Sequence, residues 1–128
     1  MWELLNEIKT ALETIDDLNT VNIGAERGIG AKDTPAARIV TEYSEPSKQN
    51  KYFDQGVIQI ILLLDLKNDL PSVYEESISL ELQIREALKG IVLFNRIEYD
   101  QDAVSLMKAS ILRFTFSGIR NTVEECNL

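Results

Sequence analysis

The clearest pattern along the chain is a helical spacing of apolar residues at its start. Met1, Leu5, Ile8, Leu12 and Ile15 follow one another at intervals of four and three, which places them on one face of an α-helix. Polar turn residues come immediately after this stripe and predict the end of the helix. The chain is therefore expected to open with an amphipathic helix.

Alternating and continuous apolar segments predict strands in the next part of the chain. Short strands are expected over Val21–Glu26 and Ala36–Tyr43. The strongest signal is Gln55–Leu66, whose centre is apolar on both faces. Such a strand is covered on both sides, here by the helices or by a neighbouring subunit. The polar residues 44–54 are predicted to form a long loop of the kind that often carries function.

A second helix is marked by its termini and by its apolar face. Ser72 and Glu75 match a capping box, and Gly90 stands where a left-handed residue would end the helix. The inner face is predicted to contain Val73, Ser77, Leu80, Ile84, Ala87 and Ile91, widened by Tyr74, Ile78 and Leu88.

The end of the chain predicts two more strands, Val92–Tyr99 and Met107–Gly118, joined by a polar turn at Asp100–Asp102. The order of elements is then α-β-β-β-α-β-β. This indicates an α+β fold with a single, mostly antiparallel sheet of about five strands packed against two helices. Residues 1–119 are expected to form this one domain, and residues 120–128 a flexible acidic tail.

Charge and cysteine content narrow the class of protein. The 128-residue chain has a net charge of −8, which argues against binding phosphates of nucleic acids and against anionic membrane surfaces. Its longest apolar stretch, residues 57–66, is too short to span a bilayer, and the N-terminus does not resemble a signal peptide. The single cysteine, Cys126, points to a reducing compartment. Synthesis in the cytoplasm is the expectation.

Histidine, the side chain that most often acts as a general base, is missing from the sequence. Its absence removes Ser-His and Cys-His nucleophiles and zinc sites built from Cys and His. Gly24, Gly28 and Gly30 match neither spacing of a phosphate-binding loop. Asp100 and Asp102 could bind a divalent cation, although a turn also favours Asp. We therefore expect neither an enzyme nor a cofactor.

Protein contacts are the more promising function. Tyr52 and Phe53 come at the end of the predicted loop, and aromatic side chains on loops are typical of protein interfaces. The strand with two apolar faces is the second candidate, because a subunit contact would cover it. The predicted interface residues are Lys48, Lys51, Tyr52, Phe53, Gln59, Ile61 and Leu63.

The order of segments also matches a known pattern. It comprises the opening helix, the Asp33–Val40 segment with its acidic residue, proline and apolar strand, the long strand at 57–66, the Leu70-Pro71 break, and the helix at 72–88. In this order the chain, over residues 1–119, resembles the tail terminator proteins of long-tailed bacteriophages, the minor tail protein U-like family.

The resemblance implies a structural protein of the virion, assembled in the host cytoplasm. Members of the family form a homohexameric ring that caps the tail tube, stops its polymerisation and joins the tail to the head. The implied partners are further copies of the chain, the tail tube protein and the head-connector or neck protein, while DNA passes through without specific binding. Asp100, Asp102, Glu124 and Glu125 would then line the lumen. A head-to-tail neck or stopper protein and a small cytoplasmic binding domain are the alternatives.

Overall fold

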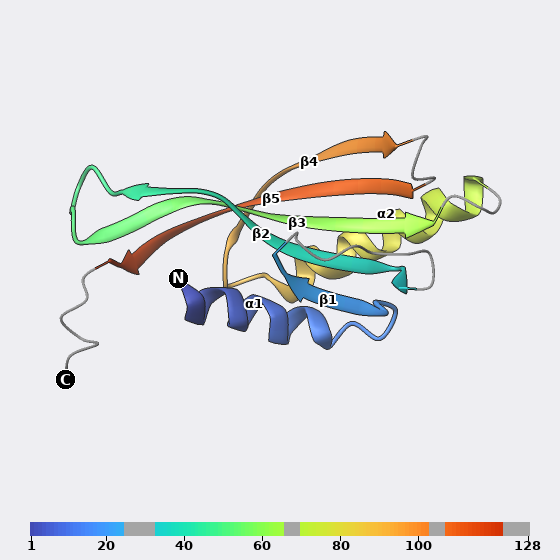
Figure 1. Cartoon of the computed structure of the whole chain (residues 1–128), viewed down its shortest axis with the longest axis horizontal. Helices are drawn as coiled ribbons and strands as arrows, with labels where there is room; N and C mark the ends of the chain where they lie inside the picture. The colour runs from blue at the N-terminus through green and yellow to red at the C-terminus, as the bar shows by residue number, and fades with distance from the viewer. Residues whose placement is uncertain (25–32, 66–69, 103–106, 122–128) are drawn as a thin grey trace.

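The protein folds as an α+β domain with the predicted order of elements, as seen in a computed structural model that describes residues 1–24, 33–65, 70–102 and 107–121 (Figure 1). Its elements are α1 (Trp2–Glu13), β1 (Thr20–Ile23), β2 (Ala36–Pro46), β3 (Phe53–Asp65), α2 (Leu70–Ala87), β4 (Leu93–Asp102) and β5 (Met107–Arg120). The five strands form one sheet in the order β1-β2-β3-β5-β4. Only the β1–β2 pair is parallel among these strands, so the sheet is mixed and mostly antiparallel.

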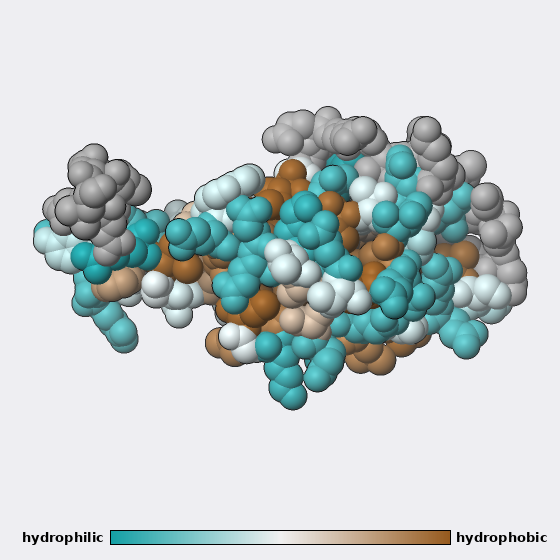
Figure 2. All heavy atoms as spheres, turned by 90° about the horizontal axis from the view of Figure 1, so that it is seen from below, coloured by the Kyte–Doolittle hydropathy of each residue, from teal (hydrophilic) through white to brown (hydrophobic). Residues whose placement is uncertain are grey.

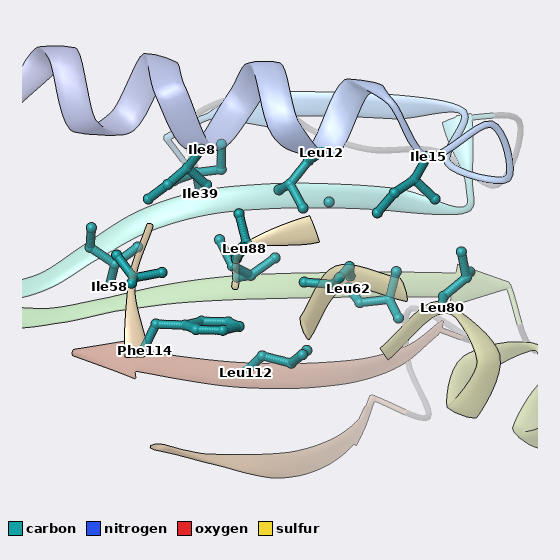
Figure 3. Packing of buried hydrophobic residues seen from close by; sticks show 14 of the residues in the cluster. Ile8, Leu12, Ile15, Ile39, Ile58, Leu62, Leu80, Leu88, Leu112 and Phe114 are labelled. Carbon is teal, nitrogen blue, oxygen red and sulfur yellow. The ribbon is translucent and has the colours of Figure 1, made fainter. Parts of the chain in front are cut away.

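The hydrophobic core lies between the two helices and one face of the sheet. Figure 3 shows Ile8 and Leu12 of α1 directed towards the strands, as the helical spacing predicts. Leu80 and Ile84 of α2, and Leu88 directly after it, are also fully buried. Full burial of a Leu or Ile side chain stabilises a fold by about 1.5–3 kcal/mol relative to leaving it exposed. The two amphipathic helices therefore hold the sheet together from a single side.

β3 occupies the centre of the sheet, between β2 and β5. Its side chains alternate between the two faces, and Ile58, Ile60 and Leu62 are fully buried beneath the helices. Ile61 and Leu63 point to the opposite face and are half-buried. Of the two coverings predicted for this strand, the helices supply that of one face only among the described elements (Figure 1). Covering of the other face by a neighbouring subunit stays a prediction.

The long loop predicted at residues 44–54 is a β-hairpin instead. β2 continues to Pro46 and β3 begins at Phe53, so the turn is confined to residues 47–52. β5 continues alongside, and Arg120 pairs with Phe53. We call residues 43–55 and 117–121 the arm; Figure 1 shows it extending away from the rest of the sheet. None of its residues is fully buried, so its sequence has no apolar period to predict a strand.

The arm leaves the sheet at two irregularities, one on each side of β3. The β2–β3 register shifts between Thr41 and Tyr43, and the β3–β5 register shifts between Asp54 and Gly56. Bulges of this kind bend a strand and increase its twist, so they redirect the hairpin. At the far end, the Asn50 side chain accepts a hydrogen bond from the Tyr52 amide at 3.1 Å and stabilises the turn.

The second helix differs from its prediction at the start. α2 begins at Leu70, so Ser72 lies inside the first turn and does not cap the helix as predicted. Pro71 is accommodated there because the first amides of a helix have no intrahelical partner. Gly90 has a φ of +89°, as predicted for the residue that follows the helix. Ile78, predicted at the margin of the inner face, is 55% exposed.

The last strands are longer than their apolar patterns predict. The backbones of Asp100 and Asp102 belong to β4, where they pair with Ala109 and Met107, so the predicted turn at these residues is wrong. Arg120 ends β5 and thus belongs to the sheet and not to a tail. Residues 25–26 of the first predicted strand and residues 122–128 of the predicted tail lie outside the described residues.

We expect Gly56→Ala to destabilise the fold more than Gly118→Ala. A Cβ atom at Gly56 would lie 2.1 Å from the carbonyl oxygen of Tyr43 and 2.9 Å from Cζ of Phe116. Overpacking costs about 1–3 kcal/mol, and the upper end applies here because a backbone atom cannot move aside. Gly118 has open space around it and a φ of +73°, so alanine there costs about 1–2 kcal/mol. Urea unfolding measures both losses; equal losses would contradict the close approach at Gly56.

Candidate interaction surface

The arm is held by backbone pairing and by polar side chains. The Asn121 amide group donates to the carbonyl oxygen of Lys51 at 2.8 Å and to Oδ1 of Asp54 at 2.7 Å. Its backbone N–H donates to the carbonyl oxygen of Tyr52 at 3.0 Å. These bonds fasten the end of β5 to the tip of the β2–β3 hairpin. The arm is thus an ordered three-stranded extension, although it has no core of its own.

The tip of the arm combines positive charge with aromatic surface. Lys48 and Lys51 are exposed, and residues 47–52 contain no acidic residue. Tyr52 is 53% exposed, with the Lys51 ammonium 5.5 Å from its ring centroid. The Arg120 guanidinium lies 5.8 Å from the ring centroid of Phe53. In the space-filling view of Figure 2 the arm is a narrow projection on which hydrophilic residues predominate. Four of the predicted interface residues, Lys48, Lys51, Tyr52 and Phe53, therefore lie together at the tip of the arm.

The other three predicted interface residues lie on the open face of the sheet, by which we mean the face opposite the two helices. Gln59, Ile61 and Leu63 alternate along β3 and are half-buried. Ile61 pairs with Ile111 of β5, so apolar surface spans the two central strands. Neither helix covers this face, and the arm extends from the sheet beyond it. The structure thus separates the predicted interface into two surfaces.

Arg113 is the centre of a charge network across the open face. Its Nε atom donates to Oε1 of Glu42 at 2.8 Å, and its Nη1 atom pairs with Oε1 of Glu98. Arg96 binds the same Glu98 oxygen at 2.8 Å. Hydrogen bonds from Arg113 hold the pKa of Glu42 and of Glu98 below the usual range of a carboxyl group. The network joins β2, β5 and β4, and sequence analysis did not predict it because the three strands meet only in the folded sheet.

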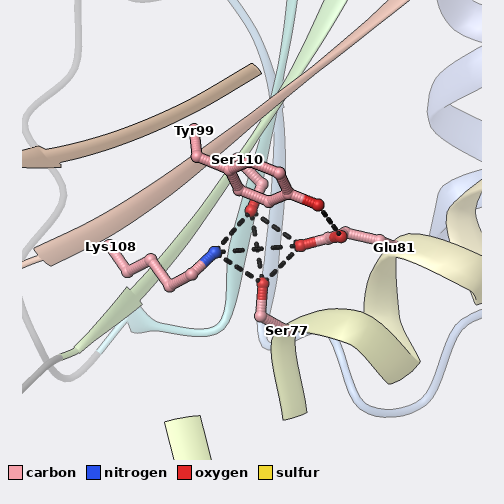
Figure 4. Close-up of polar contacts among 5 residues, drawn as sticks. All are labelled: Ser77, Glu81, Tyr99, Lys108 and Ser110. Atoms are coloured by element: carbon pink, nitrogen blue, oxygen red, sulfur yellow. Dashed lines mark hydrogen bonds and ion pairs between the residues drawn. The ribbon is translucent and has the colours of Figure 1, made fainter. Parts of the chain in front are cut away.

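A buried polar cluster joins α2 to β4 and β5 (Figure 4). Nζ of Lys108 donates to Oγ of Ser77 and to Oγ of Ser110, both at 3.0 Å. Ser110 donates to Oε2 of Glu81 at 2.8 Å, and the Tyr99 hydroxyl donates to Oε1 of Glu81 at 3.0 Å. Lys108 is 1% exposed and Glu81 is 4% exposed. The cluster therefore satisfies a buried ion pair, 3.9 Å apart, with a ring of hydroxyl groups.

Burial dominates the electrostatics of this cluster. Loss of hydration lowers the pKa of Lys108, and the charge of Glu81 opposes that shift. Burial, with the hydrogen bond to Glu81, raises the pKa of Tyr99. A lysine beside a serine hydroxyl can activate a nucleophile. Here Ser77 and Ser110 are both fully buried, so no substrate reaches their hydroxyl groups in this conformation. The cluster positions α2 on the sheet.

Sequence analysis missed this cluster except for Ser77, which it placed on the inner face of the helix. A weak signal existed in the last strand, because Lys108 and Ser110 precede Leu112 and Phe114 on the same face. Polar residues at the start of a buried row indicate a polar contact, but they do not identify the partner.

A groove of about 480 Å³ lies at the root of the arm. Tyr43, Gly56, Val92, Leu93 and Phe116 contribute to its walls, and none of the described residues that line it is charged. Ligand sites usually pair an apolar cavity with a few convergent polar groups. Within the described ranges, no group of three or more Cys, Asp or Glu residues is placed to hold a metal ion, and no helix is long and apolar enough to cross a membrane.

The four residues predicted to line a lumen are not brought together by the described part of the chain. Asp100 and Asp102 lie along β4 in backbone position, and their side chains are not described. Glu124 and Glu125 lie outside the described residues. A lumen at these positions stays a prediction.

Comparison with known proteins does not assign the chain to a family. No protein-family model matches it, and no curated protein sequence matches it. The class that the fold itself defines is an α+β domain whose central strands run on into a projecting arm. Its function is therefore argued from its surfaces.

We expect Glu81→Ala to destabilise the fold by about 3–5 kcal/mol, because it leaves the Lys108 ammonium buried without its counter-charge. The double variant Glu81→Leu/Lys108→Met should lose clearly less than the sum of its two single changes, since no unpaired charge is left. Glu75→Ala, on the exposed side of the same helix, is the control and should stay within about 0.5 kcal/mol. Additive losses in urea unfolding would show that the cluster is not coupled.

The Arg113 network should make stability depend on acid pH. Glu42 and Glu98 have lowered pKa values in the folded state. Their contribution to the free energy of unfolding is therefore fully present above the ordinary carboxyl pKa, and it is lost as the pH falls through the lowered pKa values of the folded state. Arg113→Met should therefore reduce stability at pH 7 and reduce it less as the pH falls below about 5. Urea unfolding over this pH range tests the prediction, with Lys9→Met on α1 as the ion-pair control. An effect of Arg113→Met that is equal at all pH values would contradict it.

Proposed function

We propose that this protein is a structural subunit of a virion, a tail terminator-like protein that assembles into a ring on the end of a phage tail tube. Such a ring stops polymerisation of the tube and joins the tail to the head. The observation that carries the proposal is the arm, an ordered extension that projects from the domain without burying a core of its own.

Ordering the arm costs conformational entropy. Fixing the backbone of each residue costs about 1–2 kcal/mol of conformational entropy, and the arm offsets little of it by burial. Pairing with β5 and the bonds of Asn121 nevertheless keep it extended. An exposed three-stranded extension of this kind supports a role in contacts between subunits, where its surface becomes buried.

The resemblance in the order of segments points to the same role. The arm occupies the place of the polar loop between the strands at 36–43 and 57–66, which the resemblance assigns to ring or tube contacts. Further copies of the chain, the tail tube protein and the head-connector protein are the partners proposed for it. Related neck and stopper proteins share the order of segments, so a head-to-tail neck or stopper protein is the nearest alternative.

The charge of the chain supports passage of DNA through such a ring without specific binding. A net charge of −8 repels phosphates, and screening limits this repulsion to about 8 Å at physiological salt. The proposed role requires no catalysis and no cofactor. The virion is the corresponding location, after assembly in the host cytoplasm.

A second candidate function is a small binding domain in the cytoplasm. The groove at the root of the arm favours it, because its volume of about 480 Å³ suits a small apolar ligand or a peptide side chain. This role would need no ring, so the state of assembly separates the two candidates.

We expect the purified full-length chain to form closed rings of about six subunits, because a repeated contact between two different surfaces either closes or grows into a filament. Light scattering gives the mass, and negative-stain electron microscopy shows whether the particle has a central hole. The same measurements after addition to tail tubes test for a ring at the tube end. A monomer at every concentration, and on tubes, would refute the proposed function.

A further inference from the structure

An apolar row lies on the solvent side of α2, away from the core. Tyr74, Ile78 and Leu82 recur at intervals of four, so they are neighbours on the helix surface. They are 43%, 55% and 57% exposed. The opposite side of the helix already buries its own apolar residues against the sheet. A surface helix normally has a polar outer side, so this helix has one apolar side more than the described part of the domain buries.

The edge strand β4 extends this row into a continuous patch. Tyr99 is 60% exposed, and both its ring and that of Tyr74 lie against Nζ of Lys108, at 4.6 and 5.2 Å. At the other end, Leu93 is 74% exposed and lines a groove of about 390 Å³ together with Leu82. We call these five residues the α2–β4 patch. Contiguous exposed apolar surface of this kind marks an interaction site.

The charge at the Tyr74 end of the patch is opposite to the charge at the tip of the arm. Glu75 and Glu76 are exposed beside Tyr74. At the other end, Arg85, Glu86 and Lys89 line the groove together with Leu82 and Leu93, so the acidic charge is confined to the Glu75–Glu76 end. The arm tip has Lys48 and Lys51 with no acidic residue between positions 47 and 52, and it adds the exposed ring of Tyr52. Opposite potentials of this kind select partners and their orientation.

The arm cannot reach the patch of its own chain. β3 and β5 run from the body into the arm as paired strands and fix its direction. Figure 1 shows the tip of the arm at one end of the molecule and the start of α2 at the other. A contact between the two surfaces therefore joins different copies. Because the surfaces are different, each copy keeps one of each free for a further neighbour, so the contact repeats until it closes into a ring or grows into a filament.

We propose that the arm tip of one subunit docks on the α2–β4 patch of the next, with Lys48 and Lys51 facing Glu75 and Glu76. The inference rests on the proposed assembly into a ring, and it assigns the two surfaces that make the ring contact. The open face of the sheet stays free of this contact and is available to other partners.

Two variants that each lose one surface test the pairing. The arm variant is Lys48→Glu/Lys51→Glu, and the patch variant is Ile78→Gln/Leu82→Gln, which removes the apolar surface without adding charge. All four side chains are exposed, so folding should be retained, and circular dichroism checks it. Each variant alone should be monomeric at concentrations where the unchanged chain forms rings, with the apparent Kd raised at least about tenfold. Trp2→Glu, an exposed aromatic on α1, is the matched control and should still form rings.

An equimolar mixture of the two variants is the decisive measurement. The intact arm of the patch variant can dock on the intact patch of the arm variant, and no further contact can follow. Native mass spectrometry should therefore show mixed dimers and no rings. Charge exchange within one chain, Lys48→Glu/Lys51→Glu with Glu75→Lys/Glu76→Lys, should restore rings.

The possible failures are distinguishable. If the unchanged chain forms rings and both variants do so equally well, the pairing of these surfaces is wrong and the proposed function stands. If a variant mixture gives no mixed dimer although each variant is folded and monomeric, the pairing is also wrong. If the unchanged chain is monomeric at every concentration and on tubes, both the pairing and the proposed function are wrong.

Discussion

The pairing of β3 with β5 is the interaction on which the rest of the structure depends. It runs from Asp65 and Met107 at one end to Phe53 and Arg120 at the other, with one register shift. Every described layer is attached to it: the helices cover one face, the charge network of Arg113 crosses the other, and the arm is its continuation. A single ladder of backbone hydrogen bonds thus joins the packed body of the domain to the arm.

The two ends of this ladder are stabilised by different forces. In the body, fully buried side chains such as Ile60 and Leu112 supply hydrophobic stabilisation. In the arm, no residue is fully buried, and order comes from backbone pairing and from Asn121. The close approach at Gly56 lies between the two regions, where the Phe116 ring is the last buried aromatic before the arm. The arm is therefore ordered although it adds nothing to the hydrophobic core.

The cluster around Lys108 shows that the position of α2 is specified by polar contacts as well as by packing. An apolar helix face alone tolerates small shifts along the sheet, whereas Ser77 and Glu81 must meet Lys108 and Ser110 to satisfy buried polar groups. The position matters outside the core too, because Glu81 also holds the hydroxyl of Tyr99. Glu81 of the buried cluster therefore also fixes the position of Tyr99, which belongs to the exposed α2–β4 patch.

The amino-acid sequence by itself determined the helices, the central strand and the α+β order, because their apolar periods report burial at each residue. It also predicted Lys48, Lys51, Tyr52 and Phe53 to belong to an interface and to lie in a loop; the interface stays a prediction, and the structure places the four residues at the tip of the arm. The tertiary structure alone decided that this segment is a paired arm, since its strands bury no core and gain their order from β5, far along the chain. The same holds for Lys108 and Arg113, whose partners come from distant elements. The local spacing of apolar residues indicates which side chains are buried. Contacts between polar groups that are distant in sequence form only when the sheet has formed.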